Sequence, residues 1–384
     1  FSNSSNSQTY FPPSNSATWD TISPSTFNWC QTKIDSLYSF LDTNNTKSFL
    51  LLKNGMIVLE KYFNGHSDTS NWYWASAGKA IMSFLIGIAQ QESFLNISDT
   101  TSNYLGYGWT NCSLFQEQKI TIWNQLSMTT GLDNNTSFDC TIDTCLEYFV
   151  DPATRWAYHN APYTLLRPVL ENATGQSINI YNYQKLLNPI GMNGAFIYNG
   201  FNNIFYSTSR SMARFGLLIL NNGNWNGNQI MLDTNYFNQM LSTSQTLNES
   251  YGYLWWLNGQ SSFMTPYNQF VYNGDIIPNA PNDLFFASGK NGQFINIVPS
   301  EKLVWIRMGE APDSSLVPHN FNIEIWGYIN DLICSALYND NFNKNDIKQL
   351  VRITDVFGRI VVPKYNTPLF YIYSDGTVEK KILI

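Results

Sequence analysis

The strand-like segments of this chain are concentrated near its two ends, and a long stretch of mostly helical periodicity separates them. Two apolar runs flank Asn54-Gly55 within residues 48–63, and this dipeptide between such runs is a strong β-hairpin signal. Further strand-like runs occupy residues 283–309, whereas residues 90–250 alternate helical patterns with loops rich in Gly, Asn and Asp. The two groups of strands are therefore expected to join in one sheet.

Helical patterns also precede the hairpin, at residues 26–43, and follow the last strands, at residues 319–339. We therefore predict an α/β (α+β) fold, in which an antiparallel sheet is flanked by helices from both chain ends. An α-rich lobe, about residues 90–250, is inserted between the two halves of the sheet. The active cleft is expected between sheet and lobe, which is a common place for pockets.

The composition favours an extracellular enzyme. Charged residues make up only 13% of the 384 residues, against roughly 25% in an ordinary soluble domain, so uncharged polar side chains must cover the surface. The net charge of −7, without any basic run in the sequence, argues against nucleic acid and anionic membranes as partners. No apolar run approaches the ~18 residues that a membrane-spanning helix needs.

Three parts of different character follow one another along the chain. Residues 1–25 are a polar leader without the apolar region of a signal peptide, so a signal removed earlier or a trimmed start would account for it. Residues 26–345 form the expected catalytic domain. Residues 350–384, which follow a polar linker, are predicted to form a small appended β element with two strand-like runs and an Asp375-Gly376 turn.

Two cysteine pairs are candidates for disulfides, which form in an oxidising compartment. Cys140 and Cys145 flank a short loop, and Cys30 and Cys334 can meet if the first and last helices pack together. The odd count leaves one thiol free, most simply that of Cys112. The three histidines have no ligand-like spacing to a cysteine pair, so neither a metal site nor a cofactor is expected.

The segment "WYWASAGKAIMSFLIGIAQQ" holds the first candidate for chemistry. From Ala80 onward, apolar residues recur at three- and four-residue steps, which predicts a helix with Ser76 in its first turn. Lys79 lies about one turn further, on the same side as Ser76. The pair is either a nucleophile with its proton acceptor or a helix cap with a surface lysine. The S-x-x-K spacing alone does not decide between them.

Two further motifs, in the same order along the chain, favour the catalytic alternative. Tyr158 and Asn160 stand at Y-x-N spacing in "TRWAYHNAPY", and "FFASGKNGQFINIVP" is a Gly-rich strand nearer the C-terminus. In order and spacing, the three motifs resemble those of serine β-lactamases and penicillin-binding proteins. Over residues 30–340 the chain is most similar to the class C-type branch, which includes carboxylesterases, D-amino-acid-type peptidases and 6-aminohexanoate-dimer hydrolases.

The resemblance implies a β-lactamase/transpeptidase-like fold and a role for each motif residue. Ser76 is the expected nucleophile, with Lys79 and Tyr158 as general base and acid. Burial against Tyr158 would lower the pKa of Lys79 to ~7–8, so that its amine can accept a proton. Asn160 would hold a substrate carbonyl or keep Lys79 in place, and the backbone N–H groups of Ser76 and Lys290 would bind the oxyanion.

The third motif departs from the family pattern. Counted back from "VP", its K-T-G positions fall on Ala287, Ser288 and Gly289, and a second possible register begins at Lys290. In the first register, which we prefer, alanine replaces the lysine that meets a substrate carboxylate in β-lactamases and peptidases. That replacement favours neutral esters or amides over β-lactams.

The resemblance thus predicts a secreted, periplasmic or cell-surface serine hydrolase that cleaves a small-molecule ester or amide through an acyl-enzyme. The alternatives are a β-lactamase, a D-amino-acid-type peptidase, or a non-catalytic binding protein on the same scaffold. A Ser-His-Asp hydrolase is disfavoured because the sequence contains no G-x-S-x-G motif. Residues 350–384, through "DVFGRIV" and "KKILI", resemble C-terminal sorting segments of the type IX secretion system.

Overall fold

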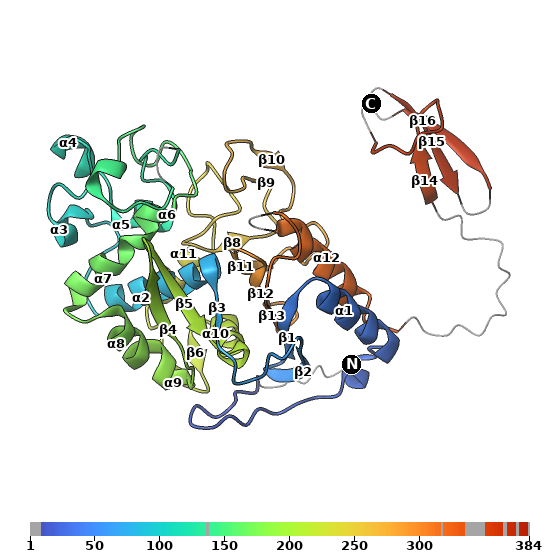
Figure 1. Cartoon of the computed structure of the whole chain (residues 1–384), viewed down its shortest axis with the longest axis horizontal. Coiled ribbons are helices and arrows are strands. Elements are labelled where there is room, and N and C mark those ends of the chain that lie inside the picture. The colour runs from blue at the N-terminus through green and yellow to red at the C-terminus, as the bar shows by residue number, and fades with distance from the viewer. Residues whose placement is uncertain are drawn as a thin grey trace, which may run out of the picture. The chain divides into compact units, whose positions relative to one another are not determined.

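The structure, a computed structural model, describes residues 9–135, 138–315, 318–334, 350–363, 367–373 and 376–382. The chain divides into two units, Phe1–Cys334 and Ser335–Ile384. The larger unit contains the six-stranded sheet and the helices described below (Figure 1). All the predicted site residues fall within its bounds.

An antiparallel six-stranded sheet is the centre of the larger unit. Its strand order is β2-β1-β13-β12-β11-β8, so the early hairpin pairs directly with strands from the far end of the unit. This order confirms that both ends of the unit contribute to one sheet. The strands are β1 (Thr46–Lys53), β2 (Met56–Tyr62), β8 (Trp256–Leu257), β11 (Phe285–Gly289), β12 (Gln293–Val298) and β13 (Leu303–Gly309).

The turn between β1 and β2 has the backbone geometry that an Asn-Gly pair favours. Asn54 and Gly55 have φ angles of 52° and 83°, as a type I′ turn requires. The N-terminal segment crosses this turn: Tyr10 N donates to Asn54 O at 2.9 Å, and Trp19 Nε1 donates to Gly55 O at 2.8 Å. Residues 9–25, which the sequence assigns to a polar leader, therefore contact the hairpin.

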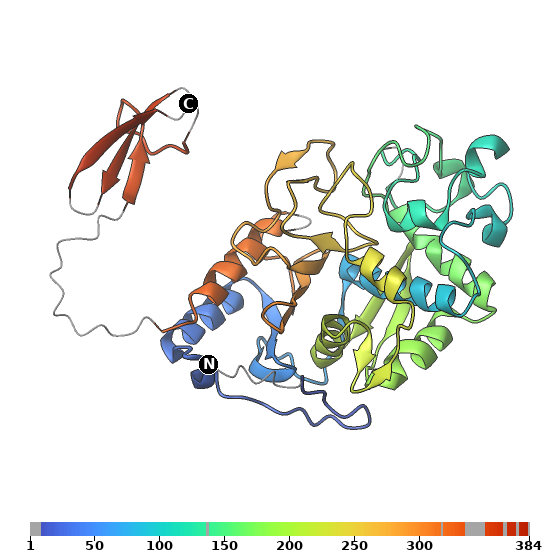
Figure 2. The same ribbon diagram turned by 180° about the vertical axis from the view of Figure 1, so that it is seen from behind.

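Helices lie on both sides of this sheet (Figure 1). On one side, α10 (Ser209–Leu220) packs against β1, β12 and β13. On the other, α1 (Gln31–Thr43) packs against β1 and against α12 (His319–Asn330), and both Figure 1 and Figure 2 show α1 and α12 side by side. A disulfide joins Cys30 and Cys334 close to these helices, with their Cα atoms 5.1 Å apart. The first and last helices therefore do pack together, which was the condition for a Cys30–Cys334 disulfide.

The residues between β2 and β8 form the inserted region. It is largely helical, as predicted, but it also contains strands β4 and β5, which the sequence analysis did not predict. Its α-helices, besides α10, are α2 (Lys79–Gln91), α3 (Ser102–Leu105), α4 (Leu114–Glu117), α5 (Ile122–Leu126), α6 (Asn160–Thr164), α7 (Leu166–Thr174), α8 (Ile178–Asn182), α9 (Asn188–Ile190) and α11 (Thr234–Met240).

Shorter elements complete the larger unit. A second antiparallel sheet has the order β3-β5-β4, and two small hairpins pair β6 with β7 and β9 with β10. These strands are β3 (Trp72–Tyr73), β4 (Ala195–Asn199), β5 (Asn202–Ser207), β6 (Asn224–Trp225), β7 (Asn228–Gln229), β9 (Ser262–Phe263) and β10 (Tyr272–Asn273). The 3-10 turns are η1 (Pro24–Phe27), η2 (Ala75–Gly78) and η3 (Asp143–Cys145), and η4 (Tyr183–Leu187) is a π-helical turn.

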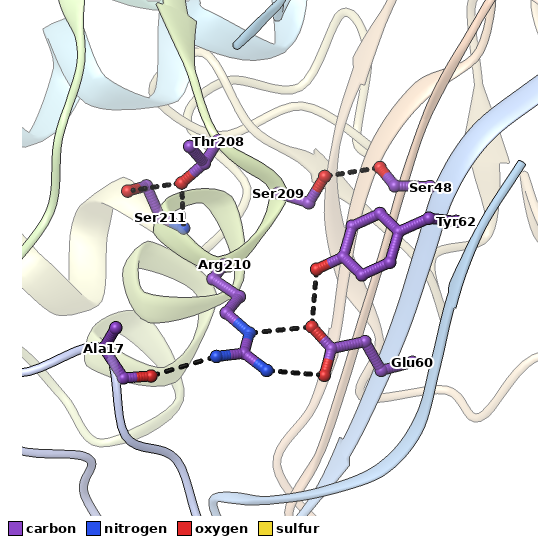
Figure 3. Close-up of polar contacts among 8 residues, drawn as sticks. All are labelled: Ala17, Ser48, Glu60, Tyr62, Thr208, Ser209, Arg210 and Ser211. Carbon is purple, nitrogen blue, oxygen red and sulfur yellow. Dashed lines mark hydrogen bonds and ion pairs between the residues drawn. The ribbon is translucent and has the colours of Figure 1, made fainter. Parts of the chain in front are cut away.

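An ion pair joins β2 to α10 (Figure 3). Arg210 donates from Nε and Nη2 to the two carboxylate oxygens of Glu60, at 2.7 and 2.8 Å, and the Tyr62 hydroxyl donates to the same carboxylate. Burial alone would raise the pKa of Glu60, but the hydrogen bonds from Arg210 and Tyr62 outweigh it and lower the pKa. Arg210 Nη1 also donates to Ala17 O at 2.9 Å, so one side chain connects the sheet, α10 and the N-terminal segment.

The smaller unit is a three-stranded antiparallel sheet with the order β14-β15-β16. It has one strand more than the two strand-like runs expected from the sequence. Asp375 of the predicted turn and residues 383–384 of the "KKILI" end lie outside the described residues. The strands are β14 (Leu350–Thr354), β15 (Pro368–Tyr373) and β16 (Val378–Ile382).

The substitution Gly55→Ala tests whether the N-terminal segment is an integral part of the fold. A Cβ at Gly55 would lie 1.9 Å from Tyr10 O, so alanine adds a steric clash to the cost of a positive φ. Gly65→Ala is the matched control, because Gly65 also has a positive φ but nothing within 4 Å of an added Cβ. We expect the free energy of unfolding to fall by ~1 kcal/mol for the control and ~2–4 kcal/mol for Gly55→Ala, measured by chemical denaturation. Equal losses would contradict the Tyr10 contact.

Candidate active site

Ser76 lies in a tight turn immediately before α2. The turn is η2 (Ala75–Gly78), and the N-cap of α2 is Gly78, so Ser76 is not the helix cap of the simpler interpretation. Ala75 has a φ of 47°, a left-handed conformation that costs a residue with a Cβ about 1–3 kcal/mol. Such strain is kept only where the surrounding structure enforces it, and it commonly marks functional sites.

Lys79 is buried and contacts Ser76. Only 3% of the residue is exposed, and its Nζ donates to Ser76 Oγ at 2.9 Å. Burial lowers the pKa of Lys79 from 10.5 to about 7, and the nearby Asp139 carboxylate opposes this shift. The neutral amine is favoured because an ammonium group loses its hydration when it is buried. Lys79 is therefore not a surface lysine.

Two buried tyrosines enclose the Lys79 amine. Nζ lies 5.2 Å from the ring centre of Tyr158 and 4.2 Å from that of Tyr163. Burial raises the pKa of Tyr158, and a hydrogen bond with Ser76 opposes the shift. Burial likewise raises the pKa of Tyr163. Both phenols are therefore protonated near neutral pH, and Tyr158 is close enough to Ser76 to exchange a proton with it.

Asn160 begins α6 and contacts a carboxylate that the motifs did not indicate. Its Nδ2 donates to Asp139 Oδ1 at 2.9 Å, while its own Oδ1 is buried without a hydrogen-bond partner. Asp139 directly precedes Cys140, which forms the predicted local disulfide with Cys145. This crosslink restricts the backbone next to Asp139.

The end of β11 lies directly against the turn that carries Ser76. A Cβ at Gly289 would be 2.4 Å from Trp74 O and 3.1 Å from Ser76 N. Glycine is required here by the close approach of two backbones, because any side chain would separate β11 from the turn. Ser288 is buried in the same strand, and the exposed Lys290 follows the strand end.

These elements surround a cleft of about 540 Å³. Five of the seven predicted site residues line it: Ser76, Lys79, Tyr158, Asn160 and Lys290. Ser288 and Gly289 belong to the adjoining strand and are not among the lining residues. These five residues come from three distant parts of the sequence, which therefore meet around the cleft.

The cleft also has lining residues that the sequence motifs did not reveal, among them Asp139, Tyr163 and Asn203. Tyr163 follows Asn160 by three residues in α6, so helical spacing could have predicted that the two share a side of the helix. Asp139 comes from a loop and Asn203 from β5, and no local pattern links either to Ser76.

Other sequence-based expectations concern cysteines, metals and membranes. Cys112 is the free cysteine, as expected once the two disulfides form. Within the described ranges, no group of three or more His, Cys, Asp or Glu side chains could hold a metal ion. None of the helices in these ranges has the length and apolar character needed to cross a membrane.

Comparison with known proteins identifies the family. The family model described as Beta-lactamase matches residues 46–315, which include the six-stranded sheet and every cleft residue named above. The chain therefore belongs to the β-lactamase family, within the serine β-lactamase and penicillin-binding protein superfamily of serine hydrolases. The resemblance seen in the sequence motifs is confirmed at this level.

Two solved structures share the fold. A candidate 6-aminohexanoate-dimer hydrolase from Bacillus anthracis superposes with a TM-score of 0.63 and 21% identity, covering 84% of this chain and 91% of that one. A candidate β-lactamase from Bacteroides dorei DSM 17855 has a TM-score of 0.63 and 16% identity, covering 79% of this chain and 99% of that one.

A curated relative is similar to part of the sequence. Protein flp from Staphylococcus aureus (strain NCTC 8325 / PS 47) is 26% identical over 167 residues, which is 38% of this chain. The match spans about a third (33%) of the length of that curated relative.

The substitution Gly289→Ala tests the close approach of β11 to the Ser76 turn. We expect a loss of ~1–3 kcal/mol in the free energy of unfolding, because the added methyl group must push the two backbones apart. Gly327→Ala in α12 is the control: its Cβ would meet only Asn279 Nδ2 at 3.7 Å, and alanine favours the helix. Chemical denaturation of both variants measures the difference. A Gly289→Ala protein as stable as the control would contradict the close contact.

Proposed function

We propose that this protein is a serine hydrolase that forms an acyl-enzyme on Ser76, with Lys79 as general base and Tyr158 as general acid. The observation that carries the proposal is the 2.9 Å contact between the Lys79 amine and the Ser76 hydroxyl. A serine hydroxyl is a weak nucleophile until a base takes its proton. Because burial lowers the pKa of Lys79 to about 7, a large share of the amine is neutral at that pH and can accept it.

Each step of the proposed reaction has a residue to perform it. Ser76 Oγ attacks the substrate carbonyl carbon and gives its proton to Lys79 Nζ. The proton then passes through Tyr158 to the leaving group as the scissile bond breaks. A water molecule next attacks the acyl carbonyl carbon and gives a proton to Lys79 Nζ or Tyr158. That proton passes to Ser76 Oγ as the ester bond breaks, which releases the carboxylic acid and restores the free serine. The backbone N–H groups of Ser76 and Lys290 would bind the oxyanion, which the close approach of β11 to the Ser76 turn supports.

Neutral esters and small amides are the proposed substrates. The close approach of Gly289 supports the register in which Ala287, Ser288 and Gly289 occupy the K-T-G positions. The family's carboxylate-binding lysine is then replaced by the buried Ala287, although Lys290 contributes a cation at the cleft. Hydrolysis of β-lactams or of D-amino-acid peptides is the second candidate function, favoured by the shared fold and by that cation.

A non-catalytic binding protein on this scaffold is less consistent with the site. Burying a lysine without a paired carboxylate at hydrogen-bond distance destabilises a fold, because the charged form loses its hydration. A binding protein gains nothing from such a lysine beside a serine, whereas an enzyme that transfers an acyl group to this serine needs a base next to its hydroxyl. The two disulfides agree with a secreted, periplasmic or cell-surface location. We also propose that the smaller unit is a sorting segment for secretion, because residues 350–384 resemble C-terminal sorting segments of the type IX secretion system.

Fluorophosphonate labelling tests the nucleophile and its base. We expect a single adduct, on Ser76, found by mass spectrometry of the digested protein and missing in Ser76→Ala. Lys79→Arg should slow labelling by ~10²–10⁴-fold, because arginine keeps the charge but cannot accept the proton. Tyr158→Phe should slow it by a similar factor, and the double variant should be little worse than either single one. An adduct on another residue, or additive and mild losses, would refute the assignment.

The labelling rate should also depend on pH through Lys79. Because only the neutral amine accepts the proton, the rate should rise as pH increases through about 7 and level off above it. Asp139→Asn removes a carboxylate that raises the pKa of Lys79, so the acid limb should move to lower pH. Asp151→Asn is the control, since the Asp151 carboxylate is solvent-exposed and pairs with Lys119. A limb that stays in place or moves to higher pH in Asp139→Asn would contradict this role.

A further inference from the structure

Two hairpin segments next to the cleft expose many large apolar side chains. They are residues 195–206, which form β4 and β5, and residues 261–274, which contain β9 and β10. Seven large apolar side chains in these two segments are more than a third exposed. Single exposed apolar residues are normal on protein surfaces, whereas a group of them beside a cleft indicates a binding surface.

The β4–β5 hairpin presents apolar side chains on a face that lines the cleft. Ile204 lines the cleft, and Ile197 is its direct partner in the antiparallel pair, so both side chains lie on one face of the hairpin. Ile197 is 50% exposed, and Phe201, in the turn between the strands, is 38% exposed. Asn199 and Asn202, on either side of this turn, also line the cleft. The apolar face of this hairpin therefore continues from the cleft to the turn.

The segment before β10 continues the cleft in the same way. Tyr267 lines the cleft, and its ring centre lies 5.1 Å from that of Phe138, which also lines it. Phe270 and Val271 follow a few residues later and are 70% and 57% exposed. The exposed side chains of the two segments that continue the cleft form the apolar rim: Ile197, Phe201, Tyr267, Phe270 and Val271.

Hydrogen bonds fix the second segment beside the site. Gln269 Nε2 donates to Trp156 O at 3.2 Å, and Trp156 is two residues before Tyr158 in the chain. The backbone N–H of Phe270 donates to Asn268 Oδ1 at 3.0 Å. The exposed ring of Phe270 therefore belongs to a hydrogen-bonded conformation that is tied to the wall of the cleft.

The charge of the two segments limits what can bind there. Neither segment contains a charged residue. An anionic membrane attracts Lys and Arg side chains, and a charged protein partner needs opposite charges on its binding surface. The apolar rim therefore suits a neutral apolar group. The substrate brings such a group to this place, because the rim is continuous with the cleft that contains Ser76.

We infer that the apolar rim binds the long alkyl chain of a neutral ester substrate while the ester carbonyl lies at Ser76. The inference rests on the proposed acyl-enzyme function and narrows its substrate class. Each methylene that contacts the rim leaves water, and this gain is kept in the transition state, so it raises kcat/KM. A short ester occupies the cleft alone and leaves the rim hydrated.

Two series of esters test this on the full chain. One series consists of p-nitrophenyl esters with acyl chains of two to ten carbons, and the other of acetates of alcohols with two to ten carbons. All substrates are kept below the concentration at which light scattering detects aggregates. A fully buried methylene strengthens binding about fourfold, and contact on one side gives less. In at least one series we expect kcat/KM to rise ~10- to 100-fold from four to ten carbons, after subtraction of uncatalysed hydrolysis.

Variants assign the preference to the apolar rim. Phe270→Ser and Ile197→Ser should each reduce the ratio of kcat/KM for ten carbons to that for four carbons by ~threefold or more. Leu232→Ser is the matched control, because Leu232 is 67% exposed but lies outside both hairpins and does not line the cleft. It should leave the ratio within twofold of the unmodified protein. Both values of a ratio come from one preparation, so a loss of folded protein lowers them equally.

The outcomes separate this inference from the proposed function. If fluorophosphonate labels Ser76 but kcat/KM stays within twofold along both series, the inference is wrong and the serine hydrolase remains. If a preference for long chains exists but neither Phe270→Ser nor Ile197→Ser reduces it, the rim is not its cause and the inference is also wrong. If these variants convert a dimer to a monomer in size-exclusion chromatography without changing the ratio, the rim binds a second copy of the chain instead. If Ser76 is not labelled and no ester is hydrolysed, both proposals fail together.

Discussion

The buried guanidinium of Arg307 connects the sheet to the turn that forms one wall of the cleft. From β13, its Nη1 donates to Asn291 O and Gly292 O at 2.6 and 3.0 Å, and its Nη2 donates to Asn44 O at 2.8 Å. Burial lowers the pKa of Arg307 to about 9, and a guanidinium is tolerated in such a place only when its N–H groups are paired. The turn after β11, which begins at Lys290, is thus fixed from the interior of the sheet. The position of the proposed oxyanion site relative to Ser76 depends on this arrangement.

The parts of the fold that could be predicted carry their signals within a few residues. Asn54-Gly55 specifies a type I′ turn by its tolerance of positive φ, and the apolar spacing of residues 80–91 specifies a buried helix. Strands β4 and β5 also flank an Asn-Gly pair, Asn199-Gly200, but the sequence analysis did not predict them. Their asparagines weaken the strand pattern, and the sheet that β4 and β5 form is completed by the two-residue strand β3, far away in the sequence.

The same distinction separates the two halves of the site. Ser76 and Lys79 are one helical turn apart, so their contact follows from local geometry, and Tyr158 could be found through the Y-x-N motif. Asp139 and Asn203 reach the cleft only through tertiary structure: a disulfide-closed loop places one, and the sheet β3-β5-β4 places the other. The burial of the Asn203 amide and its missing hydrogen-bond partners likewise cannot be read from composition or periodicity.

The disulfide between Cys30 and Cys334 encloses the whole cleft within one covalent ring, since the two residues are 304 positions apart. Every residue discussed as part of the site lies between them. A single proteolytic cut in any loop of that interval opens the ring but releases no fragment, because both pieces stay linked through the sulfur atoms and paired through β1 and β13. A molecule cut once by a protease would therefore keep Ser76 and Tyr158 in one covalently linked molecule, and its two pieces could separate only after reduction.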